Sequence, residues 1–465
     1  MKQTASVIST YTADVSGVAS ALYELGGMTV IHDASGCNST YNTHDEPRWY
    51  DRDSYVFISA LTEIDAVMGN DEKILRDIER AAEELHPEFI ALCGTPIPMM
   101  TGFDFEAMAK LVEEKTGVPA FGIPTNGMHT YISGAGKAFA CLAERMVKRE
   151  NKKGTAGGKS AEGEDNPGGK SAGKEDKEGE MSAEREDNPG KKSAKGENKA
   201  GRISVNILGA TPLDFSVNGE LESLESRMEA SGFGIVSNWA MNGHYGNENK
   251  EENREVQDQQ GRTPGRASLQ AIEKAGTADV NLVVSSAGLA AAKILQKRFG
   301  IPYVTGIPIG PEGGRLLTAK IKDAAAGKFP DRIKRKSPAE NIRQGGESFD
   351  TVLIYEPVIG ESIAAGMERE TGKAVRLVSP IPPADYGETE KTDPFLRDGD
   401  AFAEDEDDLI PLLKQAKIVI ADPMYRLMCP ENVKFIPFPH EAFSGRIYRR
   451  EIPDLVKGIP INWLS

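Results

Sequence analysis

The sequence predicts an α/β protein made of three Rossmann-like, doubly wound units, each built on a parallel sheet. Three observations lead to this prediction. Short apolar runs alternate with amphipathic stretches of about 10 to 15 residues, which is the pattern of parallel strands joined by helices. The alternation stops at one long polar segment and resumes after it. The 465 residues are enough for about three domains of ~150 residues each.

The first unit is predicted to span residues 1–149. An amphipathic pattern predicts a helix over residues 17–25, close to the start of the chain. Four apolar runs predict strands, and three longer amphipathic stretches predict helices. The predicted strands cover residues 28–32, 56–59, 89–93 and 120–123, and the predicted helices cover residues 71–85, 104–116 and 133–148.

A low-complexity segment, residues 150–201, separates the first unit from the second. It contains no Leu, Ile, Val, Phe, Tyr or Trp, and EDNPGGKSAGKE at 164–175 returns as EDNPGKKSAKGE at 186–197. Such a segment cannot bury enough apolar surface to offset the entropy cost of ordering it. We therefore predict a disordered linker, although a functional role for it stays open.

The second unit is predicted over residues 202–346 and the third over residues 347–465, with the polar stretch 331–347 joining them. In the second unit, RISVNILGATPLDF predicts a strand and a turn, VNLVVSS a strand, and IPYVTGIPIG a strand that enters a Gly-rich turn, while LESLESRMEASG and AGLAAAKILQKRFG predict helices. In the third unit, FDTVLIYEP, AVRLVSP, KIVIADP and VKFIPFP predict strands, while IGESIAAGMERETG and DLIPLLKQA predict helices. The acidic run 404–408 is expected to be the solvated start of a helix rather than a metal site.

Composition argues against several classes of function. The net charge of −16 and the pI near 5.1 disfavour a nucleic-acid or anionic-membrane partner, since both require a basic surface. No run approaches the ~18 apolar residues of a membrane span, and the first residues lack the apolar core of a signal peptide. We therefore expect a soluble, cytoplasmic protein.

The four cysteines include no C-x-x-C pair, which excludes a zinc ribbon and disfavours a disulfide framework. Cys37 follows one predicted strand on a small-residue turn, and Cys93 ends another. Ligands of open α/β sheets bind beyond the carboxyl ends of the strands, so both thiols fall on the functional edge of one sheet. Each is either an inert buried thiol or a group that takes part in ligation or catalysis. Cys141 and Cys429 are expected to serve packing.

Among the six histidines, His440 has the most suggestive setting, because FIPFPHEAFSGR puts it after a strand in a loop flanked by Pro and Gly. A catalytic role, a ligand role and a purely structural role all stay open for it. The stretch TYISGAGKAFA is not a P-loop, because Ala138 follows Lys137 where Ser or Thr is required. Ser285 and Ser286 lack the G-x-S-x-G setting of an α/β-hydrolase.

Three segments together resemble the nitrogenase component 1 family: MTVIHDASGCNSTYNTH at 28–44, ISALTEIDAVMGNDEKILRDI at 58–78 and PEFIALCGTPIPMMTGFDFEAM at 87–108. That family includes molybdenum–iron protein subunits, their cofactor-assembly scaffolds and tetrapyrrole reductases. The resemblance continues to VKFIPFPHEAFSGR and covers nearly the whole chain except the linker. It implies three Rossmann-like domains, in agreement with the periodicity.

The resemblance also implies a cluster site between two subunits. Cys37 and Cys93 match the second and third of three family cysteines that hold an iron–sulfur cluster, while the first should lie near Tyr11, where this chain has no cysteine. Two thiolates from each of two chains suit one [4Fe–4S] cluster. The expectation is therefore a shared [4Fe–4S] cluster and not an eight-iron P-cluster.

A second implied site lies in the central cavity. His440 matches the family's cofactor histidine, whereas the family's cofactor cysteine falls at Ser285–Ser286, where the thiol is absent. Nitrogen fixation with the standard cofactor is therefore not expected. The cavity is expected to take another metal cofactor or an organic substrate, with His440 as ligand or proton donor.

The implied function is a subunit of a nitrogenase-like, two-component reductase. An ATP-hydrolysing iron protein would dock near Cys37 and Cys93, which agrees with the missing P-loop, and the second subunit would be identical or a paralogue. Two alternatives stay open: a cofactor-assembly scaffold without turnover, and a non-redox binding protein on the same fold. The substrate is not identified by the sequence.

Overall fold

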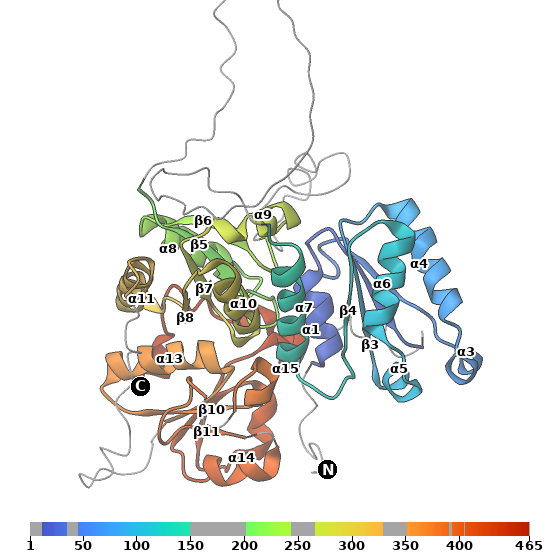
Figure 1. Cartoon of the computed structure of the whole chain (residues 1–465). Coiled ribbons are helices and arrows are strands. Elements are labelled where there is room, and N and C mark those ends of the chain that lie inside the picture. The colour runs from blue at the N-terminus through green and yellow to red at the C-terminus, as the bar shows by residue number, and fades with distance from the viewer. Residues whose placement is uncertain are drawn as a thin grey trace, which may run out of the picture. The chain divides into compact units, whose positions relative to one another are not determined.

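The computed structural model describes residues 12–34, 45–148, 201–242, 266–328, 351–389, 393–403 and 405–464. In these residues the strands form three sheets, and all paired strands run parallel (Figure 1). The predicted fold class is therefore confirmed. The predicted linker lies outside the described residues except for Gly201, and the predicted domain boundaries remain predictions.

The first sheet has the strand order β2-β1-β3-β4 and is covered on both faces by helices. Because side chains alternate along a strand, Leu92 packs with α4 and α6, whereas Cys93 packs with α1 and α7. The elements are α1 (Asp14–Leu22), β1 (Met28–His32), β2 (Tyr55–Ile58), α3 (Glu63–Met68), α4 (Asp71–Leu85), β3 (Ile90–Gly94), α5 (Pro96–Thr101), α6 (Phe105–Thr116), β4 (Ala120–Ile123) and α7 (Tyr131–Arg145).

The second sheet has the order β6-β5-β7-β8. The predicted stop of one helix is confirmed, because Gly300 ends α10 in the left-handed region with φ 74°. The strands are β5 (Ser204–Leu208), β6 (Gly234–Asn238), β7 (Val280–Val283) and β8 (Tyr303–Thr305), and the helices are α8 (Glu220–Ala230), α9 (Leu269–Glu273), α10 (Leu289–Phe299) and α11 (Gly310–Ala325), with short 3₁₀ turns η1 (Ala275–Thr277) and η2 (Ser286–Gly288).

The third sheet has the order β11-β10-β9-β12-β13. Its strands are β9 (Thr351–Ile354), β10 (Val375–Ser379), β11 (Ala401–Phe402), β12 (Ile418–Ala421) and β13 (Lys434–Pro437). Its helices are α13 (Pro357–Thr371), α14 (Glu406–Leu413) and α15 (Glu441–Ser444), with 3₁₀ turns η3 (Pro383–Tyr386), η4 (Pro423–Met428), η5 (Gly445–Glu451) and η6 (Ile461–Trp463).

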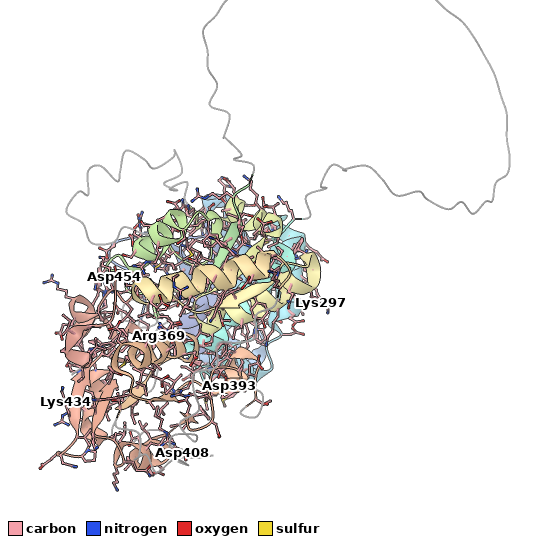
Figure 2. The ribbon with its side chains drawn as sticks, turned by 90° about the vertical axis from the view of Figure 1, so that its left-hand side faces the viewer. Lys297, Arg369, Asp393, Asp408, Lys434 and Asp454 are labelled. Atoms are coloured by element: carbon pink, nitrogen blue, oxygen red, sulfur yellow. The ribbon has the colours of Figure 1, made fainter. Side chains whose placement is uncertain are left out.

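The described part of the acidic run, residues 405–408, forms the start of helix α14, as predicted. The Asp405 side chain accepts a hydrogen bond from the Asp408 backbone N–H at 2.9 Å and so caps the helix. Asp407 and Asp408 are exposed, but Glu406 is buried, so the run is not solvated throughout. Other charged side chains, such as those of Lys297 and Lys434, lie exposed on the outside of the fold (Figure 2).

Helices α1 and α7 lie side by side (Figure 1) and approach each other through glycines. A Cβ atom added to Gly134 would lie 1.8 Å from the Asp14 carbonyl oxygen, and one added to Gly17 would lie 2.0 Å from the Tyr131 carbonyl oxygen. Side chains at these positions would separate the helices, so the small residues set the close packing between them. Among the described residues, no helix has both the length and the apolar character that a membrane span requires.

Candidate functional site

The two cysteines singled out in the sequence belong to one edge of the first sheet. β1 and β3 are neighbours, and their register pairs Ile31 with Cys93 and His32 with Gly94. The chain that leads toward Cys37 therefore leaves β1 next to Cys93. Cys37 itself lies in residues 35–44, outside the described residues, as does Tyr11. The predicted pairing of Cys37 with Cys93 stays a prediction.

Cys93 is fully buried in the apolar core that β3 shares with α1 and α7. Burial raises the pKa of the Cys93 thiol well above its usual value, and the negative charge of Asp14 raises it further, against a lowering hydrogen bond from Thr125. The thiol is therefore protonated at neutral pH. Because metals bind the thiolate, a metal at Cys93 would have to displace this proton.

His32 was not singled out in the sequence, although it ends β1 beside Gly94. Its Nδ1 lies 2.7 Å from Ser59 Oγ, and its ring packs 4.2 Å from the ring of Phe103. Burial lowers the pKa of His32 to about 4, so the ring is neutral at physiological pH. A neutral, fixed imidazole thus adjoins the segment that leads to Cys37.

The environments of the other two described cysteines, Cys141 and Cys429, agree with a packing role. Cys141 on α7 is half-buried and packs against the core of the first sheet. Cys429 is half-buried as well, and its Sγ lies 3.5 Å from the Tyr425 carbonyl oxygen. Burial raises the pKa of both thiols to about 11.

His440 lies between β13 and α15 and is held at both its backbone and its ring. Its backbone N–H donates to Asp422 Oδ2 at 2.8 Å, and its Nδ1 accepts the Ala442 backbone N–H at 3.1 Å. A neutral imidazole has only one accepting nitrogen, so this contact assigns the proton to Nε2. His440 thus caps α15 with one nitrogen and presents an N–H with the other.

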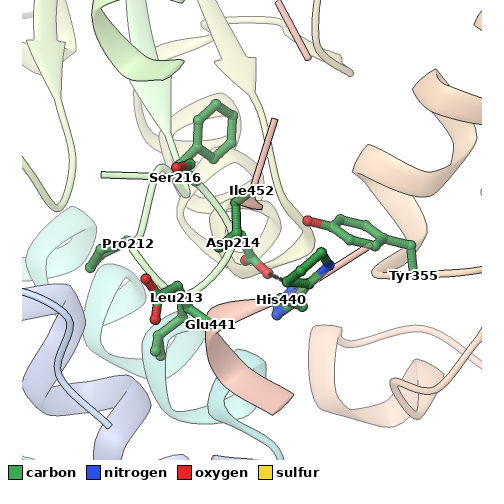
Figure 3. Close-up of a pocket in the computed structure, with 10 residues that line it drawn as sticks. Pro212, Leu213, Asp214, Ser216, Tyr355, His440, Glu441 and Ile452 are labelled. Atoms are coloured by element: carbon green, nitrogen blue, oxygen red, sulfur yellow. Dashed lines mark ion pairs between the residues drawn. The ribbon is translucent and has the colours of Figure 1, made fainter. Parts of the chain in front are cut away.

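The Nε2 atom of His440 faces Asp214, which comes from the second sheet (Figure 3). The two atoms His440 Nε2 and Asp214 Oδ1 are 3.3 Å apart, and the Tyr131 hydroxyl donates to the same Oδ1 at 2.5 Å. The ring centroids of Tyr355 and Phe443 lie 4.8 Å from that of His440, and the His440 side chain is buried. This contact between His440 and Asp214 lacks the geometry of a hydrogen bond, so Nε2 is left without an acceptor among the described residues.

Asp214, Tyr355 and His440 line a pocket at the carboxyl ends of β5, β9 and β13, where open α/β sheets bind ligands. The gaps between its lining side chains are too narrow for a water molecule. A large cofactor would therefore fit only if the pocket opened. Its lining residues are Pro212, Leu213, Asp214, Phe215, Ser216, Tyr355, Pro439, His440, Glu441 and Ile452.

Buried carboxyl groups surround this pocket. Glu356 caps α13 and accepts backbone N–H groups of Ser286, at 2.6 Å, and Ile359, at 2.8 Å. Burial raises the pKa of Glu356, and likewise that of Glu220, to about 8. The backbone of Ser286, one of the two serines at which the resemblance implies the family thiol to be absent, thus contacts a carboxyl group that is largely protonated at neutral pH.

The burial of Glu356 predicts a pH-dependent stability. Its pKa is raised from 4.5 to about 8, so its contribution to stability is complete below pH 4.5 and is lost as the pH rises through about 8. Glu356→Gln, which mimics the protonated acid, should remove this loss. Between pH 5.5 and pH 9, the variant should gain about 2–4 kcal/mol of unfolding free energy relative to the wild type. Urea unfolding of both proteins across this range measures it, and parallel pH profiles would contradict the prediction.

The structure puts the predicted residues in two separate settings: Cys93 in the core of the first sheet, and His440 in the pocket of the second and third sheets. Sequence reasoning missed Asp214 and Tyr131. Asp214 could have been found, because it follows the predicted strand of RISVNILGATPLDF by a few residues. Tyr131 carries no such signal, since it begins a helix and reaches the pocket only through the fold.

Comparisons with known proteins identify the family of this chain and proteins that share its fold. A family model described as nitrogenase component 1 type oxidoreductase matches residues 16–345, more than half of the chain. A curated relative is the nitrogenase iron-molybdenum cofactor biosynthesis protein NifE of Methanosarcina barkeri, which is 23% identical over 268 residues. That match covers 57% of this chain but only 44% of the relative, so the chain spans less than half of the relative's length.

Solved structures of nitrogenase Cp1 share the fold. The structure at pH 6.5 matches with a TM-score of 0.62 and 15% identity, over 100% of this chain and 92% of that chain. The structure at pH 5 matches with a TM-score of 0.56 and 14% identity, over 96% of this chain and 86% of that chain. At such identities the likeness concerns the fold alone.

Proposed function

Because this chain belongs to the nitrogenase component 1 type oxidoreductase family, we propose that it is a subunit of a two-component reductase. Cys37 and Cys93 would each supply a thiolate to a [4Fe–4S] cluster shared with a second chain, identical or paralogous, as four thiolates per cluster require. When bound, the cluster would supply one-electron transfer. The observation that carries the proposal is the pairing of β1 with β3, since the segment toward Cys37 leaves the sheet beside Cys93.

The position of Cys93 suits a cluster ligand, but its thiol would have to lose its proton to bind iron. The thiol is at the end of β3, and its burial would shield a bound cluster from solvent, which is one way that proteins set a cluster's potential. Because the pKa of the thiol is raised, cluster binding has to release a proton. Among the described residues, no group of three or more His, Cys, Asp or Glu side chains is arranged to hold a metal.

A partner surface adjoins this edge of the sheet. Helix α3 follows β2, helix α5 follows β3, and the two helices contact each other. They expose large apolar side chains that a free surface would not favour: Ile64, Val67, Met68, Ile97, Met99 and Met100. We assign this α3–α5 surface to the ATP-hydrolysing iron protein, because a protein docked there would sit at the edge that carries the cysteines.

Met68→Glu is expected to weaken binding of the iron protein by at least tenfold, because a charge would be buried within an apolar contact. Met68 is 77% exposed, so the change should not disturb folding. Leu111→Glu on α6, at a side chain that is 45% exposed, is the matched control. Binding of the organism's own iron protein, measured for both variants, checks the prediction; equal affinities would assign the docking surface elsewhere.

A second candidate function is a cofactor-assembly scaffold. It is favoured by the curated relative, whose name is that of a cofactor biosynthesis protein. The tight packing around His440 also suits a protein without turnover at that site. A third reading, a non-redox binding protein, requires no cluster at all.

Anaerobic purification with iron, sulfide and EPR measurements separates these functions. The reductase proposal expects about four irons and four sulfides per two chains and a reducible EPR signal. A cluster without any substrate reduction in the presence of the iron protein would favour the scaffold. A protein purified without iron, and unable to take up a reconstituted cluster, would overturn both.

A further inference from the structure

The pocket around His440 leaves three buried polar atoms without a hydrogen-bond partner among the described residues. They are the acceptors Asp214 Oδ2 and Glu441 Oε2, and the donor His440 Nε2. The three side chains are 0%, 2% and 2% exposed, respectively. A buried polar atom without a partner costs about 1–3 kcal/mol, and such atoms are rare in folded proteins. Three of them lining one pocket point to a ligand that satisfies them together.

The charge around the pocket restricts which ligand this can be. Asp214 and Glu441 line it, whereas none of the described lining residues is a lysine or an arginine. Arg449 lies behind Glu441 and is already engaged, donating to Glu441 Oε1 at 2.7 Å and to the Pro47 carbonyl oxygen at 2.6 Å. An anionic ligand would therefore meet buried carboxyl groups with no cation available in the lining to balance it.

The hydrogen-bonding character of the three unpartnered atoms restricts the ligand further. A ligand that satisfies the two acceptors and the one donor of the pocket needs two donors and one acceptor of its own. A primary carboxamide carries this set, with two N–H bonds and one carbonyl oxygen. Its carboxylate counterpart has the same heavy-atom skeleton but only acceptors, so it would satisfy His440 Nε2 and offer no hydrogen to Asp214 Oδ2 or Glu441 Oε2.

We propose that the Asp214–His440–Glu441 pocket binds a small, uncharged ligand group with N–H donors and an adjacent acceptor, of the carboxamide type, and rejects the corresponding carboxylate. The N–H groups of the ligand would donate hydrogen bonds to Asp214 Oδ2 and Glu441 Oε2, and its acceptor atom would accept one from His440 Nε2–H. This deepens the proposed function, on which it rests, by naming a substrate class for the site. The gaps are narrow, so the ligand has to widen the pocket and a fragment should bind weakly.

Acetamide and acetate form a matched pair of probes for the full-length protein. Ligand-detected NMR titration should show that acetamide binds at least tenfold more tightly than acetate. In Asp214→Asn the side chain offers an N–H donor in place of an acceptor, so the preference should shrink or reverse. Glu441→Gln should have the same effect independently, and Asp408→Asn, at an exposed position of α14, should leave the preference unchanged.

Equal binding of the two probes, no binding of acetamide, or a preference that persists in both pocket variants would overturn the inference. Iron analysis of the same samples keeps it distinct from the proposed function. Iron present without an amide preference would overturn this inference alone. An amide preference in a protein that takes up no iron would overturn the reductase proposal and leave the pocket assignment standing.

Discussion

Gly134→Ala is expected to destabilise the protein by more than ~3 kcal/mol of unfolding free energy. The added Cβ would lie 1.8 Å from the Asp14 carbonyl oxygen and 2.6 Å from its carbonyl carbon. These are backbone atoms at the start of α1, which cannot turn aside as the end of a long side chain can. Relief would require α1 and α7 to separate, and with them the core that they share with β3.

Gly136→Ala is the matched control for this change. It lies on the same helix two residues later, and its added Cβ would meet only the Ala287 carbonyl oxygen at 3.5 Å, an ordinary contact. Alanine also favours a helix over glycine by up to ~1 kcal/mol, so this variant should be neutral or slightly stabilised. Urea unfolding compares the two. If Gly134→Ala were as stable as Gly136→Ala, the close approach of α1 and α7 would be wrong.

Cys37→Ala is expected to reduce the iron content from about four per two chains to near zero. In the proposed dimer each chain supplies two of four thiolates, so the substitution removes one ligand per variant chain: two of four where the chains are identical, and one of four where the partner is a paralogue. Iron and sulfide analysis after anaerobic purification measures the loss, and EPR should lose the cluster signal. Full iron content in Cys37→Ala would refute the assignment of this cysteine.

Two further variants separate ligand loss from misfolding. Cys141→Ala removes a half-buried thiol from α7 and should keep its iron. Cys93→Ala removes a thiol from the core, so it should lose iron and also about 1 kcal/mol of unfolding free energy through the small cavity it leaves. A folded Cys93→Ala protein with its iron intact would show that this thiol is an inert core residue.

Strong local periodicity let the sequence predict most of the fold. β1, β4 and α4 match their predicted ranges to the residue, and β3 is shifted by one residue, because each is a continuous apolar run or a clear amphipathic helix. Strand β6 was missed because it carries buried polar residues. The Ser237 hydroxyl donates to Asn206 at 2.7 Å and accepts from the Trp239 indole N–H at 2.9 Å, so tertiary hydrogen bonds satisfy side chains that look solvated in the sequence.

Helix α3 was missed for a different reason. None of its residues is buried, so it has no apolar stripe facing a core and no helical period to detect. Its start is nevertheless marked by a capping box between Thr62 and Asp65, which the sequence does contain. The iron protein proposed to dock on the α3–α5 surface would cover its exposed apolar side chains.

By itself, the sequence determined the three parallel sheets and the position of Cys93 and His440 at strand ends, because strand patterns are local and strand ends follow from them. Only the tertiary structure decided what surrounds these two residues. The Tyr131 hydroxyl reaches Asp214 across 83 positions of sequence, and Asp214 in turn faces His440 from another sheet. Burial and hydrogen bonds of this kind set where protons lie and which ligand fits, and they join residues that no local pattern connects.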